Sequence, residues 1–219
     1  NLPVIGQWVG NYQIVKKLGQ GGMGAVYEAI QSSPRRTVAL KMLRFGFASE
    51  ASVARFRYEA EVLGELLHPG IAQVHEAGTH TDPASPQEPL PYFAMEYVEE
   101  ASTILEHAAA HELDVRAKLA LFGEVCEAVH FGHQKGVVHR DLKPGNIIVD
   151  DAGQPKILDF GVARATDADV QTITLQTDVG QLVGTLPYMS PEQWGRGQVD
   201  ERSDIWAVGI ILWELLTGR

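Results

Sequence analysis

The chain is organised around residues His139–Asn146, which read His-Arg-Asp-Leu-Lys-Pro-Gly-Asn, and around the triplet Asp-Phe-Gly at residues 159–161. These stretches carry two acids, a lysine and an amide. Apolar runs flank them at Val137–Val138, Ile147–Val149 and Ile157–Leu158. Short apolar runs bounded by polar residues predict short strands, and loops mounted on strands commonly carry functional side chains. We therefore expect the chemistry of this chain to lie on these two loops.

In this order and with these flanking runs, the two stretches resemble the catalytic loop and the metal-binding turn of the eukaryotic-type (Hanks-type) serine/threonine protein kinases. Either triplet alone could be an ordinary loop acid that caps a turn, but the two together disfavour that alternative. The resemblance implies that Asp141 orients and deprotonates a substrate hydroxyl and that Lys143 is a cation on the transferred phosphoryl group. It also implies that Asn146 and Asp159 bind Mg²⁺, with Mn²⁺ as the other candidate metal. Lysine at position 143, followed by Pro144, resembles the serine/threonine class rather than the tyrosine class.

A glycine-rich stretch at Gly19–Gly24 follows a predicted strand at Tyr12–Leu18. The residues after it, Ala25–Ile30, predict a second strand rather than the helix that follows a dinucleotide-binding glycine turn. This favours a glycine hairpin whose backbone approaches a triphosphate, with a plain glycine hairpin as the alternative. A third strand is predicted at Thr37–Lys41. A lysine at a strand end is commonly an edge residue, but the resemblance makes Lys41 the ligand of the α- and β-phosphates of ATP.

A helical pattern spans Ser49–Leu67. Its apolar positions fall on one face, and they are Val53, Phe56, Ala60, Leu63 and Leu67. The resemblance makes Glu59 the ion-pair partner of Lys41. Glu61 is the competing carboxylate, and Glu59 is preferred because it leaves Leu63 one turn further on the same side of the helix.

The resemblance places ATP between a small β-rich lobe and a larger helical lobe. It assigns the back of the adenine pocket to Met95 and the adenine edge to the backbone of Glu96 to Val98, at the end of a strand predicted at Tyr92–Val98. The glycines implied to contact the phosphates are Gly19, Gly21, Gly22 and Gly24, and the apolar side chains implied to close around the base are Leu18, Val26, Ala39 and Ile148. These four apolar residues could equally be ordinary core.

Two further segments precede the strand at Tyr92–Val98. Ile71–His75 predicts a strand, and the proline-rich segment Thr81–Pro91 predicts a surface loop rather than a domain linker. We expect residues 1–98 to form an N-terminal lobe with the glycine-rich loop and its helix. Residues 99–219 are expected to form part of a C-terminal lobe with the catalytic loop and the activation segment.

A second helix is predicted from the N-cap Asp114 to about Lys135, with Gly136 at its end. Its predicted inner face comprises Leu119, Phe122, Val125, Cys126 and Val129. His130 and His133 lie three residues apart on this helix, but no third ligand is nearby in the sequence. A metal site is therefore disfavoured there.

The chain from Val162 to Met189 is polar and threonine-rich, and it leads into Ser190-Pro191-Glu192. This part resembles the activation segment of the kinases, with Ser190 in place of the more usual alanine. The resemblance implies that Thr185 bonds to the catalytic acid and lysine, and that Arg140 offers a cation to a phosphorylated segment. The candidate phosphorylation sites are Thr172, Thr174 and Thr177.

The last predicted helix, Asp204–Leu216, is apolar nearly all round, which indicates a buried helix. Asp204 resembles the acid that braces the catalytic loop from beneath. Kinases carry further helices after this one, including the arginine that pairs with the acid at Glu192, whereas this chain stops at Arg219 after a Gly218 stop signal. We therefore expect either a fragment of a longer protein or self-association through the uncovered helix face.

The composition argues against several other classes of protein. With 219 residues, 45% of them hydrophobic, the chain can bury a sizeable core. A formal net charge of −10 argues against nonspecific binding to nucleic acid or anionic membranes. Cys126 is the only cysteine, so no internal disulfide or cysteine-based zinc cluster can form, and a reducing, cytoplasmic location is expected. No apolar run reaches the length of a membrane span, so any membrane anchor is expected outside this chain.

Together these patterns predict an α+β, bilobal protein-kinase-like fold with a small antiparallel sheet lobe and a mainly helical lobe that lacks its last helices. The implied activity is transfer of the γ-phosphoryl group of Mg-ATP to serine and threonine hydroxyls of proteins, with autophosphorylation of the activation segment. The bacterial branch is suggested by Gly-Gly-Met-Gly at residues 21–24 and by the segment at residues 185–193. A pseudokinase-like nucleotide-binding scaffold is the alternative, above all for a truncated chain, although every catalytic residue named above is present. A small-molecule phosphotransferase is disfavoured because residues 185–192 resemble the protein-substrate kinases.

Overall fold

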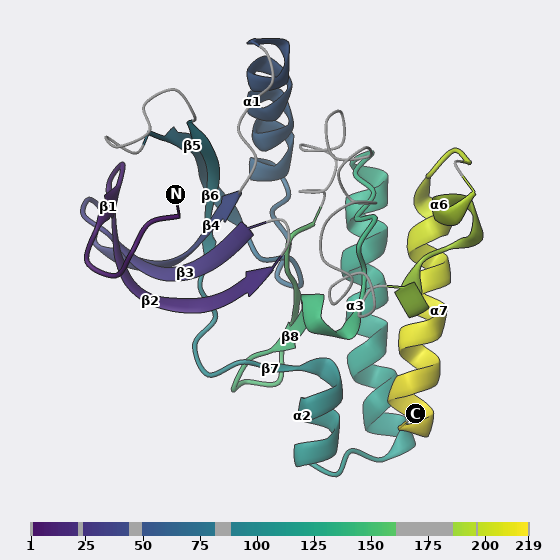
Figure 1. Ribbon diagram of the computed structural model, residues 1–219. Helices are drawn as coiled ribbons and strands as arrows, with labels where there is room; N and C mark the ends of the chain where they lie inside the picture. Colours follow the sequence, from purple (N-terminus) through teal and green to yellow (C-terminus); the bar gives the residue numbers. More distant parts are fainter. Residues whose placement is uncertain are drawn as a thin grey trace. The chain divides into compact units, whose positions relative to one another are not determined.

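The computed structural model describes residues 2–21, 24–43, 50–81, 89–160, 186–195 and 197–218. The chain divides into two compact units. The first unit holds the described residues up to Glu65 together with Gln73–Tyr97. The second unit holds Leu66–Ala72 and the described residues from Val98 onward. The first is mainly sheet and the second mainly helix (Figure 1), which confirms the predicted α+β class.

The first unit is built on a six-stranded antiparallel sheet with the strand order β1-β2-β3-β4-β6-β5. The strands are β1 (Trp8–Val9), β2 (Tyr12–Gly21), β3 (Gly24–Gln31), β4 (Arg36–Leu43), β5 (Val74–His80) and β6 (Leu90–Glu96). Figure 1 shows that the sheet curls. Alternate residues of its strands project into one buried cluster, because successive side chains of a strand point to opposite faces. The larger members of this cluster are Tyr12, Ile14, Tyr27, Leu40, Met42 and Tyr92.

Helix α1 (Glu50–Gly64) packs on the opposite face of this sheet. The ring centroids of Phe56 in α1 and Phe93 in β6 lie 4.9 Å apart. Phe56 and Leu63 are buried, as predicted. The helix ends at Gly64, however, and Leu67 is 64% exposed, so its placement on the apolar face of this helix is wrong. The chain turns there into His68-Pro69, and a proline disfavours helical geometry in the residue before it.

The second unit contains three short strands and four helices among its described residues. The strands pair antiparallel in the order β7-β8-β9, with β7 at Ser102–Thr103, β8 at Ile147–Val149 and β9 at Pro155–Ile157. The helices are α2 (Ile104–Ala110), α3 (Val115–Gln134), α6 (Pro191–Trp194) and α7 (Glu201–Thr217), and two single 3₁₀ turns lie at Pro144–Asn146 and Leu186–Tyr188. Helices α3 and α7 run side by side (Figure 1) and are joined by a side-chain contact described below. Residues Val137–Val138 belong to no helix or strand, so the strand predicted there is wrong.

The ends of α3 agree with the sequence prediction, but part of its inner face does not. The Asp114 side chain accepts the backbone N–H of Ala117 at 2.8 Å and so caps the helix, and Gly136 follows its end with a φ of 72°. Leu119 is 47% exposed and was wrongly assigned to the inner face. The buried positions are Leu121, Phe122, Val125, Ala128, Val129 and Gly132. Cys126 is only half-buried, and this partial burial raises the pKa of its thiol.

Two predicted boundaries in the first half of the chain are wrong. Ile71 makes only an isolated bridge to Ile157, and the strand begins at Val74. Ile71 and Ala72 belong to the second unit, and the N–H of Ala72 donates to the carbonyl of Ile157 there, which the hydrophobic periodicity alone does not reveal. The predicted loop at Thr81–Pro91 includes residues 82–88, which lie outside the described residues, and β6 already begins at Leu90. Proline is tolerated at Pro91 because β4 no longer pairs with β6 there.

Helix α7 is less buried than its composition predicts. Ser203, Asp204, Ala207, Ile211 and Leu215 are buried along one face. On the other side, Ile205, Trp206 and Trp213 are 58%, 48% and 54% exposed. Among the described residues, one side of α7 is therefore uncovered, as expected from the sequence for this helix.

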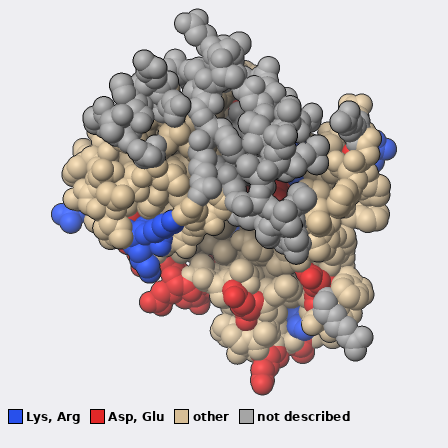
Figure 2. Space-filling view, viewed as in Figure 1, with Lys and Arg blue, Asp and Glu red and all other residues tan. Residues whose placement is uncertain are grey.

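Two further features concern the surface of the described residues. No helix in the described ranges is long and apolar enough to cross a membrane. Figure 2 shows acidic side chains over α2 and the turn that follows it, where Glu106, Glu112 and Asp114 are exposed. The excess of acidic residues in the sequence is therefore visible on this face.

Candidate active site

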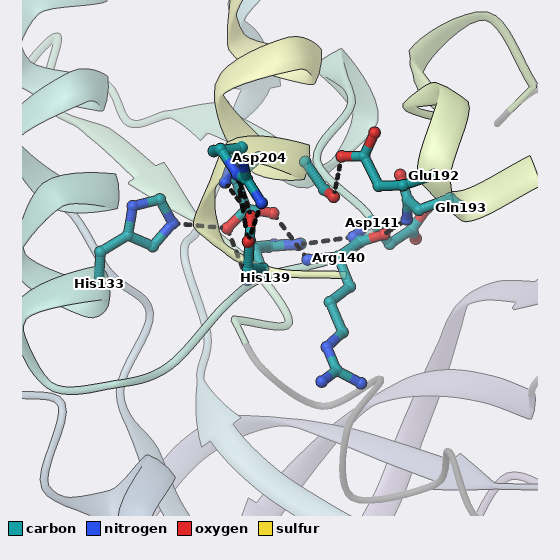
Figure 3. A network of polar contacts seen from close by, with 10 residues as sticks. His133, His139, Arg140, Asp141, Glu192, Gln193 and Asp204 are labelled. Carbon is teal, nitrogen blue, oxygen red and sulfur yellow. Dashed lines mark hydrogen bonds and ion pairs between the residues drawn. The ribbon is translucent and has the colours of Figure 1, made fainter. Parts of the chain in front are cut away.

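The loop His139–Asn146 is fastened to α7 by one buried carboxylate. Asp204 lies in the first turn of α7 and is 1% exposed. Its Oδ2 accepts the backbone N–H of His139 at 2.8 Å, and its Oδ1 accepts the backbone N–H of Arg140 at 2.8 Å (Figure 3). A buried carboxylate that bonds two successive N–H groups restrains the backbone, because any other arrangement would leave polar groups unsatisfied. The predicted brace between this acid and the loop is confirmed.

A further contact on Asp204 comes from α3. Nε2 of His133 lies 2.7 Å from Oδ2 of Asp204 (Figure 3), and the His133 side chain is 8% exposed. Because a carboxylate only accepts hydrogen bonds, the imidazole donates at Nε2. From the sequence, His133 is considered only as a metal ligand, so this role is missed. The available signal was its position one helical turn after Val129, on the buried side of α3.

His139 connects the loop to the chain that enters the Asp-Phe-Gly triplet. Its side chain is fully buried, its Nε2 lies 2.9 Å from the carbonyl oxygen of Leu158, and its Nδ1 accepts the N–H of Asp141 at 3.2 Å. These partners place the ring proton on Nε2. Phe160 packs edge-to-face on the same ring, with centroids 5.2 Å apart. One imidazole therefore restrains both parts of the predicted site.

Three of the predicted catalytic residues are in direct contact. Lys143 Nζ lies 2.8 Å and 3.2 Å from the two carboxylate oxygens of Asp141. Asn146 Nδ2 donates to the backbone carbonyl of Asp141 at 2.7 Å and lies 3.2 Å from its Oδ2. The Asp141 side chain is 27% exposed, so it remains accessible from solvent. The result is a carboxylate with fixed orientation, a cation on one side and an open face.

The two predicted metal ligands are brought together by backbone pairing. Leu158 N–H donates to the carbonyl of Asn146 at 2.8 Å, and Asp159 follows with a positive φ of 56°. Within the described ranges, both side-chain hydrogen bonds of Asn146 use Nδ2 and none uses its amide oxygen. Carboxylate and amide oxygens are donors that Mg²⁺ accepts, so this pair fits the implied metal. Among the described residues, no group of three or more His, Cys, Asp or Glu side chains offers another metal site.

The first unit gathers several predicted nucleotide-binding residues on one face of its sheet. Val26 lies opposite Lys41 in the β3–β4 pair, and Ala39 lies opposite Met95 in the β4–β6 pair. Opposed residues of antiparallel strands project from the same face, and Ala39 and Lys41 are two residues apart in β4. All four therefore share one face. Phe93 also lies opposite Lys41, so this is the face on which α1 packs.

Helix α1 presents one of its two candidate glutamates toward the sheet. Glu59 is half-buried and lies one turn after the buried Phe56, whereas Glu61 is exposed. This difference favours Glu59 as the residue that approaches the Lys41 face.

The glycine-rich stretch is a β-hairpin, as predicted. Strands β2 and β3 pair as far as Gly21 opposite Gly24, with Gly19 opposite Val26. A side chain at Gly24 is excluded because a Cβ would lie 1.9 Å from the carbonyl oxygen of Met42. Gly22 lies outside the described residues.

The other predicted nucleotide contacts are more dispersed. Leu18 is 41% exposed in β2, and Ile148 is half-buried in β8 of the second unit. The N–H of Glu96 donates to the carbonyl of Gln73 at 2.8 Å. Val98 is half-buried just after β6.

The segment 186–195 is tied to its surroundings by side-chain contacts that the sequence analysis does not predict. Tyr188 donates to Glu214 of α7 at 2.7 Å, and Ser203 of α7 donates to Glu192. Gln193 donates from Nε2 to the backbone carbonyl of Arg140 at 2.7 Å. Thr185 and the candidate phosphorylation sites Thr172, Thr174 and Thr177 lie outside the described residues.

Comparison with known proteins agrees with this architecture. The family model described as "Protein kinase domain" matches residues 12–219. The chain is 38% identical over 216 residues to the probable serine/threonine-protein kinase PknB of Bifidobacterium longum, covering 96% of this chain and 30% of that protein. It is 39% identical over 212 residues to the serine/threonine-protein kinase PrkC of Bacillus subtilis, covering 96% of this chain and 31% of that protein.

A third relative gives the same result. The chain is 39% identical over 210 residues to the serine/threonine-protein kinase PknB of Mycobacterium tuberculosis, covering 95% of this chain and 32% of that protein. The chain thus spans about a third of the length of these relatives. The predicted protein-kinase-like fold is confirmed. The chain belongs to the protein kinase domain family and is similar to its bacterial members.

Proposed function

We propose that the chain is the catalytic domain of a serine/threonine protein kinase, which transfers the γ-phosphoryl group of ATP to serine and threonine hydroxyls of proteins. The observation that carries the proposal is the Asp141 carboxylate, held by Lys143 and Asn146 on a loop that Asp204 fixes. The similar proteins are named serine/threonine-protein kinases, which supports the substrate class. Because the chain spans about a third of those relatives, the activity of the whole protein is part of the proposal.

In this proposal Asp141 acts on the substrate hydroxyl. Its exposed carboxylate edge accepts a hydrogen bond from the hydroxyl, orients the oxygen and takes the proton as the new P–O bond forms. The bonds from Asn146 to the backbone and carboxylate of Asp141 restrict rotation of the acid. Lys143, beside that carboxylate, places a positive charge where the transferred group gains negative charge.

The remaining charged residues bind the co-substrate. When bound, ATP supplies the transferable phosphoryl group, and the accompanying Mg²⁺ or Mn²⁺ neutralises part of the phosphate charge. Asn146 and Asp159 would hold the metal through their side-chain oxygens. Lys41 would bind the α- and β-phosphates, with Glu59 orienting its ammonium group.

Backbone and apolar groups would hold the rest of the nucleotide. The backbone N–H groups at Gly19, Gly21, Gly22 and Gly24 would approach the phosphates, where a Cβ would obstruct them. Met95 and the backbone of Glu96 to Val98 would meet the adenine. The apolar side chains proposed to enclose it are Leu18, Val26, Ala39 and Ile148.

We also propose autophosphorylation at Thr172, Thr174 or Thr177. A phosphothreonine carries nearly two negative charges, and Arg140 would supply a cation that orders the segment.

The test is transfer of radiolabelled γ-phosphate by the full-length natural protein to itself and to a generic protein substrate. The expected product is acid-stable phosphoserine and phosphothreonine, formed with Mg²⁺ or Mn²⁺ and abolished by chelation. Mapped sites should include at least one of the three threonines. Nucleotide binding without any transfer would replace the proposal with the scaffold alternative.

A further inference from the structure

Gln193 makes two different kinds of contact with the two ends of its side-chain amide (Figure 3). Its Oε1 accepts the backbone N–H of Ser190 at 3.0 Å and the hydroxyl of Ser190 at 3.2 Å, which forms the capping box of α6. Its Nε2 donates to the backbone carbonyl of Arg140 at 2.7 Å. The first contact stabilises the short helix, whereas the second crosses to the catalytic loop, 53 residues away in sequence.

The backbone that receives this bond is strained. Arg140 has a φ of 69°, a left-handed conformation that a residue with a side chain adopts only at a cost in free energy. Such a conformation persists where the surroundings hold it. Here the N–H of Arg140 is held by Asp204 Oδ1 at 2.8 Å, and its carbonyl is held by Gln193.

The peptide group between Arg140 and Asp141 is therefore bonded at both of its polar atoms. Gln193 bonds the carbonyl at 2.7 Å, and Nδ1 of His139 bonds the N–H of Asp141 at 3.2 Å. Rotation of this peptide would turn the Cα–Cβ bond of Asp141 and move its carboxylate. Gln193 is the partner in this arrangement that comes from the segment 186–195.

We propose that Gln193 is a positioning residue, which couples docking of the segment 186–195 to the orientation of the Asp141 carboxylate. The segment is already held on α7 through Tyr188 and Glu192, and α7 also carries Asp204. Gln193, Tyr188 and Asp141 line the same small pocket. The Gln193 amide thus transmits the position of the segment to the catalytic loop. This inference rests on the proposed function, because it gives Asp141 the role of base.

The substitution Gln193→Glu separates the two contacts. Glutamate keeps the oxygen that accepts from Ser190, and it serves as well as glutamine in a capping box. It replaces the donor with a second oxygen, which faces the Arg140 carbonyl and repels it. We expect kcat to fall about tenfold, since small misplacements of a catalytic group reduce rate steeply. The KM for ATP should stay close to that of the wild type, and the thermal midpoint should fall less than in Gln193→Ala, which loses the Ser190 contacts as well.

Two matched variants serve as controls in the full-length protein. Gln198→Glu makes the same chemical change at an exposed position nearby and should leave kcat unchanged. Ser190→Ala removes the hydroxyl contact of the cap but keeps both the backbone N–H that donates to Oε1 and the Nε2 donor, so it should lower the thermal midpoint more than it lowers kcat. A merely structural role predicts that Gln193→Glu loses as much thermal stability as Gln193→Ala and that kcat and KM change together. That result would overturn the proposal.

Amide hydrogen exchange over residues 137–146 gives a readout that does not depend on activity. Gln193→Glu should speed exchange at Arg140 and Asp141, and Gln198→Glu should not. Exchange and kcat both at wild-type values in Gln193→Glu would overturn the inference. If the wild type transfers no phosphate, the proposed function fails, and the exchange comparison alone then decides whether Gln193 holds this peptide.

Discussion

At the scale of single residues, the contact between Lys143 and Asp141 is central to the proposed mechanism. The ammonium group lies 2.8 Å from one carboxylate oxygen, and both side chains are a little over a quarter exposed. A single ion pair that is still partly open to solvent adds little to folding stability. Its position beside the candidate base indicates a role in chemistry instead.

The substitution Lys143→Met tests this role. It removes the charge and retains most of the side-chain length, so we expect kcat to fall by about 100-fold, as when one electrostatic contact to a transition state is lost. The unfolding free energy should change by less than about 0.5 kcal/mol, as is usual for a surface position. Steady-state kinetics and urea denaturation measure the two quantities. Lys135→Met, at an exposed position on the end of α3, is the control, and a kcat loss of similar size there would contradict the assignment.

Single residues also show why part of the site could be predicted from sequence and part could not. Asp141, Lys143 and Asn146 lie within one short loop, so their types and spacing are visible together. His133 and Gln193 act on partners 71 and 53 residues away. Nothing in their local pattern names those partners, because the contacts exist only after α3, α6 and α7 have packed.

At the scale of elements, a glycine in α3 allows the helix to pack closely against Phe160. A Cβ at Gly132 would lie 2.2 Å from the Phe160 ring, so this turn of α3 leaves the space that Phe160 occupies. Phe160 is 3% exposed and packs on His139. The sequence predicted the ends of α3, because capping residues act locally, but it did not predict this contact. The strand predicted at Ile71–His75 is wrong for a similar reason, because the pairing partner changes within this run and only the folded structure shows it.

Two alanine substitutions in α3 test this fit. Gly132→Ala should destabilise the protein by about 1–3 kcal/mol, because overpacking forces Phe160 to move. Gly123→Ala, in the same helix with nothing within 4 Å of the added Cβ, should stabilise it by about 0.5–1 kcal/mol through higher helix propensity. Urea denaturation of both variants gives the comparison. Changes of the same sign in the two variants would contradict the packing described for Phe160.

At the scale of the whole molecule, each unit contains at least one tyrosine bonded to a carboxylate. In the first unit Tyr12 and Tyr92 donate to Glu76 at 2.7 Å and 2.8 Å, which links β2 and β6 to β5. In the second unit Tyr188 donates to Glu214. Burial, together with the neighbouring carboxylate, raises the pKa of all three phenols above the ordinary value.

This arrangement predicts a loss of stability at alkaline pH. An unfolded tyrosine loses its proton near pH ~10, before the folded ones do, so rising pH favours the unfolded state. The contribution of these groups is complete below that pH and disappears as pH rises toward the folded pKa. Urea denaturation from pH 8 to 11 should show a shallower decline for Tyr188→Phe than for the wild type. Tyr58→Phe, at a residue that is 66% exposed, should leave the slope unchanged; equal slopes in all three proteins would refute the explanation.

The central claim is that Asp141 is the base of a phosphoryl transfer, and one comparison tests it most directly. The rate of γ-phosphate transfer is measured for full-length protein carrying Asp141→Asn and, separately, Asp151→Asn, which makes the same change at an exposed turn residue. We predict that Asp141→Asn lowers kcat by about 100- to 10,000-fold while ATP binding is retained, as expected when a general base is lost. Asp151→Asn should match the wild type. Transfer by Asp141→Asn at the wild-type rate would contradict the claim.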